Sequence, residues 1–115
     1  MSQPTEQLMH EIVETLKEKK GIDIVTLNLQ EVSLLADYFV ICHGNSTTQV
    51  QSLASEVMEK VEKLGLTIRR MEGFDAARWV LIDVADVIVH IFHREERQYY
   101  NLERLWSDAK VIEHA

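Results

Sequence analysis

Two stretches of the chain carry apolar residues at the three- and four-residue spacing of an amphipathic helix. The first spans residues 4–20, and Gly21 follows it as a C-cap. The second begins at Ser46, which forms a capping box with Gln49, and Gly65 stops it. The apolar positions of the two predicted helices are Leu8, Ile12, Val13, Leu16, Val50, Leu53, Ala54, Val57, Met58, Val61 and Leu64.

Further segments have the alternating or continuous hydrophobicity of β-strands. These predicted strands are residues 22–29, 38–42, 66–71, 78–84 and 87–93. The run at 38–42 is continuously apolar, which favours a strand buried on both faces. The last two strands are separated by a turn near Ala85 and Asp86, which predicts an antiparallel hairpin.

The end of the chain, residues 95–108, reads as a polar helix with large aromatic side chains. The predicted order of elements is therefore α-β-β-α-β-β-β-α. A buried strand joined to another through a helix calls for a right-handed crossover, whereas the hairpin calls for antiparallel pairing. We predict an α/β fold, with a mixed sheet of about five strands and flanking helices, in a single domain over residues 1–115.

The composition is that of a folded, acidic protein. Of its 115 residues 46% are hydrophobic, and 19 acidic and 12 basic residues give a formal net charge of −7. This balance disfavours non-specific binding to a phosphate backbone and favours a partner with a basic surface. A lone cysteine, Cys42, excludes an internal disulfide framework. Without a membrane-spanning run, a signal core or a transit pattern, we expect a cytoplasmic protein.

Two polar groups could carry chemistry, but each has a simpler structural interpretation. Gly44, Asn45 and Ser46 precede a predicted helix and could hold an anion, although they lack the Gly-rich cradle and lysine of a P-loop. Ser46 as a plain N-cap explains the same residues. Asp83 and Asp86 could bind Mg²⁺, yet they flank a predicted turn, where Asp is common.

A zinc site and a cysteine nucleophile are also disfavoured. Cys42 and His43 are neighbours on one strand, and His90 and His93 are three apart on another, so each pair points to opposite faces. The apolar neighbours of Cys42 would raise the pKa of its thiol rather than activate it. We therefore expect neither a metal ion nor a cofactor.

His90 is a polar residue in an otherwise apolar strand. It shares a strand face with Ile88 and Phe92, which is typical of a buried core histidine. Its imidazole then needs a hydrogen-bond partner, and Asp83, Glu72 or a C-terminal tyrosine could supply one.

The run from His90 to Trp106 is unusually rich in aromatic and charged residues. Tyr99, Leu102 and Trp106 lie on one face of the predicted last helix, and Trp79 adds a large aromatic ring from the hairpin. Tyr, Trp and Arg are the residue types enriched at binding hot spots. Two interpretations stay open: the helix only covers the sheet, or some of its aromatic rings remain reachable for a partner.

Three motifs, in order along the chain, resemble the signatures of the Iojap-related ribosomal silencing factors (RsfS). The resemblance covers nearly the whole chain, from about Leu8 to Ile112, although Cys42 and His43 stand where small residues are more usual. The motifs are DYFVI (37–41) with GNS (44–46); EG (72–73) with WVLID (79–83) and VHIF (89–92); and RQYYNLERLW (97–106).

The resemblance implies a fold related to nucleotidyltransferases without their activity, and a role in translation. A member would bind the large ribosomal subunit at its fourteenth protein, block joining of the small subunit and repress translation, notably when nutrients run short. Organelle relatives are linked to large-subunit assembly, and a homodimer is compatible with the family. The predicted strand at 66–71 carries no acidic pair, and Asn45 separates Gly44 from Ser46, so the carboxylates of a nucleotidyltransferase are not visible. The alternatives are a nucleotide-binding enzyme and a ribosomal RNA binder.

The resemblance and the composition together predict a binding surface with no catalytic residue. The residues expected to contact the partner, or to support the contact directly, are Trp79, Tyr99, Tyr100, Leu102 and Trp106. Glu72, Asp83 and Arg97 are candidates for polar positioning, and His90 is a candidate for a supporting role behind them.

Overall fold

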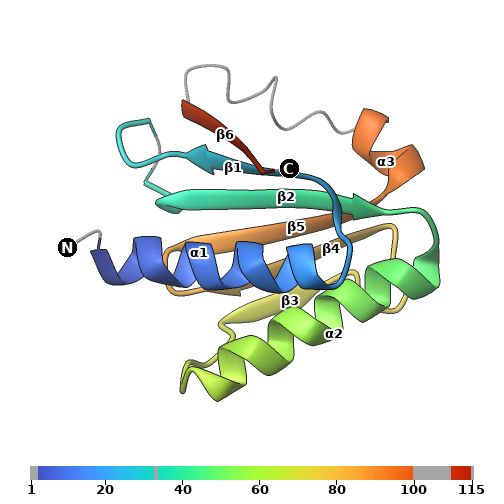
Figure 1. Ribbon diagram of the computed structural model, residues 1–115, viewed down its shortest axis with the longest axis horizontal. Coiled ribbons are helices and arrows are strands. Elements are labelled where there is room, and N and C mark those ends of the chain that lie inside the picture. Colours follow the sequence, from blue (N-terminus) through green and yellow to red (C-terminus); the bar gives the residue numbers. More distant parts are fainter. Residues whose placement is uncertain (1–2, 33, 100–109, 115) are drawn as a thin grey trace.

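The computed structural model describes residues 3–32, 34–99 and 110–114. Its elements are α1 (Gln3–Glu18), β1 (Ile22–Asn28), β2 (Tyr38–Gly44), α2 (Thr47–Lys63), β3 (Arg70–Glu72), β4 (Trp79–Val84), β5 (Val87–His93), α3 (Arg94–Tyr99) and β6 (Lys110–His114). The strands form one mixed sheet in the order β3-β4-β5-β2-β1-β6 (Figure 1). Within the described ranges, β2 and β5 are parallel neighbours and the other strand pairs are antiparallel.

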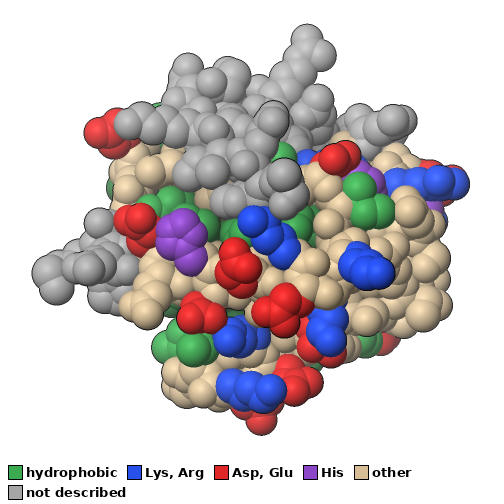
Figure 2. Space-filling view, viewed as in Figure 1, with side chains coloured by type: hydrophobic (Ala, Val, Ile, Leu, Met, Phe, Trp, Pro, Cys, Tyr) green, Lys and Arg blue, Asp and Glu red, His purple; other side chains and the backbone are tan. Residues whose placement is uncertain are grey.

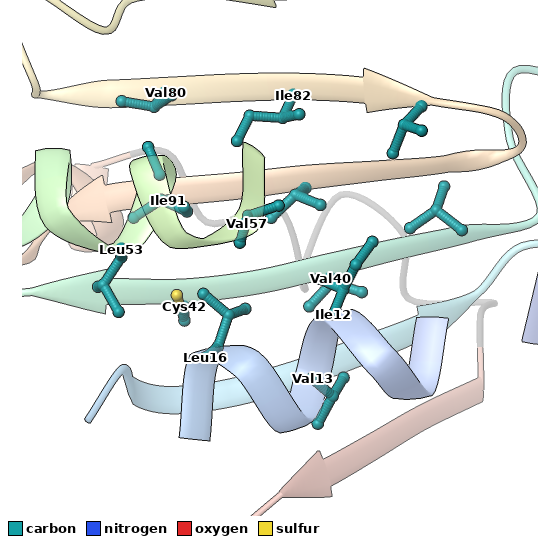
Figure 3. Close-up of a cluster of buried hydrophobic side chains, with 14 of the residues drawn as sticks. Ile12, Val13, Leu16, Val40, Cys42, Leu53, Val57, Val80, Ile82 and Ile91 are labelled. Carbon is teal, nitrogen blue, oxygen red and sulfur yellow. The ribbon is translucent and has the colours of Figure 1, made fainter. Parts of the chain in front are cut away.

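Both long helices pack against the same face of the sheet (Figure 1). Ile12 and Leu16 of α1, with Leu53 and Val57 of α2, are fully buried in the core between helices and strands (Figure 3). The outer faces of the helices carry interspersed acidic and basic side chains (Figure 2). This division of apolar and charged positions confirms the helical periodicity of the sequence. Among the described residues, no helix is long and apolar enough to cross a membrane.

Local hydrogen bonds fix both ends of α2. The Ser46 hydroxyl accepts from the backbone N–H of Gln49 at 3.1 Å, so the predicted N-cap is confirmed. The Gln49 side chain accepts from the backbone N–H of Asn45 at 2.8 Å, one residue before the cap. At the other end, Gly65 has a φ of 77°, a left-handed conformation that ends the helix.

The strand predicted to be buried on both faces is β2. It lies between β1 and β5, and its residues Tyr38–Cys42 are all buried. Its helix-facing residues join the core under α1 and α2, and Phe39 and Ile41 face the opposite side. That opposite side has a second apolar cluster, formed by Val25, Leu27, Leu29, Ala36, Phe39, Ile41, Ile88 and Phe92.

The predicted hairpin is confirmed as β4 and β5, with Ala85 and Asp86 at the turn. Ala85 has a φ of 51°, in the left-handed region that a tight hairpin turn requires. The carbonyl of Asp86 accepts from the backbone N–H groups of Asp37 at 2.8 Å and Tyr38 at 3.2 Å. These bonds tie the hairpin turn to the start of β2.

The strand predicted at 66–71 is displaced and shorter, because β3 covers only Arg70–Glu72. The backbone N–H groups of Gly65 and Leu66 donate to the carbonyls of Glu62 and Val61, respectively. Leu66, the first residue of the predicted strand, therefore belongs to the C-terminal cap of α2 instead. The later residues of the predicted strand lie next to β4 and pair with it. This pairing begins at Arg69, whose backbone N–H donates to the Asp83 carbonyl at 2.8 Å.

The end of the chain also differs from the prediction. Of the helix expected at 95–108, the structure describes α3, which ends at Tyr99, and residues 100–109 lie outside the described part. A sixth strand, β6, pairs antiparallel with β1 and was not predicted. The five residues of β6 are too few to give a clear periodic signal in the sequence. They form a strand because β1 offers them an edge of the sheet to pair with.

Candidate partner-binding site

The β3–β4 surface, as we name it, lies on the sheet face opposite α1 and α2. Val80, Ile82 and Val84 of β4 point into the helix-covered core, so the alternate residues of this strand point the other way. The strand register places Arg70 opposite Asp83 and Glu72 opposite Leu81. The β3–β4 surface consists of Arg70, Glu72, Trp79, Leu81 and Asp83.

This surface combines apolar and acidic groups that are at least partly accessible. Trp79, Leu81 and Asp83 are half-buried, whereas Arg70 and Glu72 are exposed. Arg70 Nε lies 3.4 Å from a carboxylate oxygen of Glu72, so one of the two acids is partly neutralised. Three residues predicted from the sequence, Glu72, Trp79 and Asp83, thus share one surface, and Leu81 was missed although it lies two positions from Trp79 on the same strand.

Trp79 is held by two side chains of β5, its neighbour in the sheet. Its ring stacks on Phe92, with centroids 5.0 Å apart and an angle of 29° between the planes. Its Nε1–H donates to Nδ1 of His90 at 3.1 Å. One side of the indole therefore packs on the second apolar cluster of the sheet, and the residue as a whole is half-buried.

His90 lies behind this surface and is buried, as predicted. Burial lowers the pKa of its imidazole from 6.5 to about 4, so the ring is neutral near pH 7. The expectation that Asp83 or Glu72 would bond to it is wrong, because Trp79 occupies its Nδ1. Leu81 separates Glu72 from His90 in the register, and Asp83 pairs with Ile88 instead.

Arg97 lies apart from the β3–β4 surface. It is on α3 and donates to the carbonyl of Ile22 at 3.2 Å, with Nη1 also 3.0 Å from Nδ1 of His43. These contacts connect α3 to β1 and β2 at the far side of β5 from Trp79. In the described contacts Arg97 therefore holds α3 on the sheet, and its predicted role toward a partner stays a prediction.

A second arginine, absent from the sequence prediction, connects α3 to the start of β4. Arg78 Nη2 lies 2.9 Å from carboxylate oxygens of both Glu95 and Glu96. These acids raise the pKa of the guanidinium, and Arg78 in turn lowers the pKa of Glu95. The pairs are solvent-accessible, so they tie α3 to the start of β4 more than they stabilise the fold.

The remaining predicted contact residues cannot be placed on this surface. Tyr100, Leu102 and Trp106 lie outside the described residues, and Tyr99 is described only through its position at the end of α3. Their roles stay predictions.

The burial of Cys42 fits its interpretation as a structural cysteine. Cys42 is fully buried, and burial raises the pKa of its thiol to about 12, so it is no nucleophile. Cys42 belongs to the helix-side core, whereas its neighbour His43 reaches Arg97, as expected for adjacent strand residues. In the described part of the chain, no three His, Cys, Asp or Glu side chains are grouped so that they could hold a metal ion.

The sequence of residues 2–115 matches the family described as "Ribosomal silencing factor during starvation". The chain is 49% identical over 108 residues to the ribosomal silencing factor RsfS of Halalkalibacterium halodurans, covering 94% of this chain and 92% of that protein. It is 52% identical over 96 residues to RsfS of Bacillus subtilis, covering 84% and 81%. The chain belongs to the ribosomal silencing factor family. The resemblance carried by its three motifs is thereby confirmed.

Solved structures similar to this chain support the α/β fold. A crystal structure from Bacillus halodurans has a TM-score of 0.84 at 46% identity, covering 95% of this chain and 99% of that one. A crystal structure from Chromobacterium violaceum has a TM-score of 0.86 at 33% identity, covering 89% and 85%. The chain is also 29% identical over 104 residues to the chloroplast protein Iojap of Zea mays, covering 89% of this chain and 44% of that protein.

Proposed function

We propose that this silencing factor represses translation by binding the large ribosomal subunit at its fourteenth protein and blocking association with the small subunit, especially under nutrient limitation. It would do so in the cytoplasm, as a single non-catalytic domain without a cofactor. Family membership supports the ribosomal role. A relative in Mus musculus, 27% identical over 99 residues, is named a mitochondrial protein of large-subunit assembly, which supports a second role in subunit biogenesis.

The observation that carries the proposal is the half-buried Trp79 on the β3–β4 surface, whose neighbour Leu81 lies next to Glu72 and Asp83. An accessible indole next to an aliphatic side chain is the kind of anchor that supplies affinity at an interface. Glu72 and Asp83 border this anchor, and the chain has a net charge of −7. Proteins that bind ribosomal RNA present basic surfaces, so charge complementarity favours such a protein as the partner.

A steric mechanism needs only that the bound chain occupies the space between the subunits. The folded chain measures 36 × 33 × 25 Å along its principal axes. Direct contacts between macromolecules form at heavy-atom separations of about 4 Å, so a domain of this thickness would keep the covered surfaces apart. No reaction is required, which agrees with the inert thiol of Cys42.

The proposal is tested by sedimenting the protein with isolated large and small subunits and then measuring subunit joining. We expect co-sedimentation with the large subunit alone, and fewer joined ribosomes as the protein is added. Equal binding to both subunits, or unchanged joining, would refute the proposal.

Two acids of the β4–β5 hairpin provide a matched pair of variants. Asp83 lies on the β3–β4 surface, whereas Asp86 is exposed at the turn. Asp83→Lys and Asp86→Lys change the net charge equally, so long-range attraction falls equally in both. We expect Asp83→Lys to weaken large-subunit binding about tenfold or more and Asp86→Lys to weaken it much less. Equal losses would mean that the β3–β4 surface is not the contact.

A further inference from the structure

The imidazole of His90 is an unusual group for its position in the sheet. The side chain is 4% exposed, and Phe39 meets it edge to face with ring centroids 4.6 Å apart. Phe92 lies on the same strand face, with its ring centroid 6.4 Å from that of His90. A phenylalanine would satisfy these ring contacts without the cost of burying nitrogen atoms. The polar atoms of His90 therefore need an explanation that packing does not give.

One of the two ring nitrogens has a clear role. Nδ1 accepts the Nε1–H of Trp79 at 3.1 Å, and an indole N–H can only donate. The neutral ring must then carry its proton on Nε2. That atom is buried and has no hydrogen-bond partner among the described residues. A buried donor without a partner destabilises the fold, so the bond to Trp79 is what the imidazole contributes.

The bond restricts the rotation of the Trp79 indole. Stacking on Phe92 defines the plane of the indole but lets the ring slide and turn within that plane. A hydrogen bond at Nε1 selects which edge of the ring faces His90, so it sets the rotation of the indole within that plane. An interface residue held in one orientation loses less conformational entropy when its partner binds.

We propose that His90 is a positioning residue that holds Trp79 in the orientation the ribosomal partner binds, acting through the indole rather than by touching the partner. This inference rests on the proposed function, because it assigns Trp79 to the contact. It gives a mechanism to the supporting role predicted for His90, which is itself buried and acts through a single acceptor atom.

The positioning role is tested first without any partner, by nuclear magnetic resonance of the whole ¹⁵N-labelled chain. The His90 ring should show the tautomer protonated at Nε2, with Nδ1 as acceptor. The Trp79 indole N–H signal, assigned by its loss in Trp79→Phe, should shift in His90→Phe and return toward its original position in His90→Asn. Asn offers a side-chain oxygen near the place of Nδ1. A ring protonated at Nδ1, or an indole signal that His90→Phe leaves unmoved, would overturn the proposal.

The second test measures binding of the same variants to the isolated large ribosomal subunit by sedimentation. Loss of one neutral hydrogen bond corresponds to about a three- to tenfold loss of affinity. We expect this loss for His90→Phe and near-complete recovery for His90→Asn. In a Trp79→Phe background, which already lacks the indole donor, His90→Phe should cause no further loss.

The outcomes separate this proposal from the one on which it rests. If the wild-type chain does not bind the large subunit, the proposed function fails, while the resonance experiment still decides whether His90 fixes the indole. A folded His90→Phe variant that binds like wild type would overturn the positioning role. A further loss in the Trp79→Phe background would mean that His90 contacts the partner itself, which also overturns it. If His90→Phe does not fold, the tautomer of the wild-type ring remains decisive.

Discussion

Acid should destabilise the folded chain through the imidazole of His90. Burial lowers its pKa from 6.5 to about 4 in the folded state. Between these values the unfolded chain binds a proton at this site and the folded chain does not. The fold therefore has its full stability with respect to this group above pH 6.5, and it loses stability as the pH falls toward 4, because protonation of His90 then favours the unfolded chain.

The size of the effect follows from the shift in pKa. Each unit corresponds to about 1.4 kcal/mol, so the folded state loses roughly 3 kcal/mol once the pH falls below 4. By pH 5 the loss is already about 2 kcal/mol, since nearly all unfolded chains are then protonated at this ring. His90 is 4% exposed, so solvent screens little of this penalty. For a small domain, such a loss is a large fraction of the total stability.

The assay compares wild type with His90→Phe by urea unfolding at pH 7.5 and pH 5. Phenylalanine does not titrate, so the variant avoids the loss that wild type suffers at pH 5. The unfolding free energy of the variant relative to wild type should therefore be about 2 kcal/mol higher at pH 5 than at pH 7.5. Any constant packing difference and the titration of other acidic groups cancel in this comparison. His10→Gln, which removes an exposed histidine, is the matched control for the loss of a histidine elsewhere on the chain. A difference that stays constant for His90→Phe would refute the assignment of a buried neutral imidazole.

Three further predictions concern the backbone, the thiol and the surface. Gly73→Ala places a Cβ 2.1 Å from the Trp79 carbonyl oxygen at a φ of 81°, so urea unfolding should show that the free energy of unfolding falls by about 3 kcal/mol or more. Gly65 has a φ of 77° but open space around its Cβ position, so Gly65→Ala should lower the free energy of unfolding by about 1 kcal/mol. Iodoacetamide should label Cys42 only as fast as the chain unfolds, and labelling at the rate of a free thiol would contradict its burial. Leu34→Ser, at a fully exposed side chain, should change the melting temperature little, and a large drop would mean hidden packing.

The elements that the sequence predicted well are those with local causes. The periodicity that ends at Leu16, the cap at Ser46 and the turn at Ala85 depend on residues within a few positions of each other. The family motifs likewise lie in continuous segments, which is why the resemblance was visible before the fold. Three of the candidate site residues, Glu72, Trp79 and Asp83, were found because the second of these motifs includes them.

The predictions that failed required knowledge of distant partners. β6 is a strand because β1 offers an unpaired edge, and β3 is short because the end of α2 and the position of β4 limit it. Leu81 was overlooked because an aliphatic residue in a strand looks the same whether it is buried or borders a binding surface.

The chain by itself determined its helices, its hairpin and its family, because short-range periodicity and continuous motifs contain that information. Only the tertiary structure decided which face of β4 is accessible and which acceptor His90 provides. Sheet register sets both, and it depends on pairing between strands far apart in sequence. Through that register, His90 bonds to Trp79 rather than to the acids that its sequence neighbourhood had suggested.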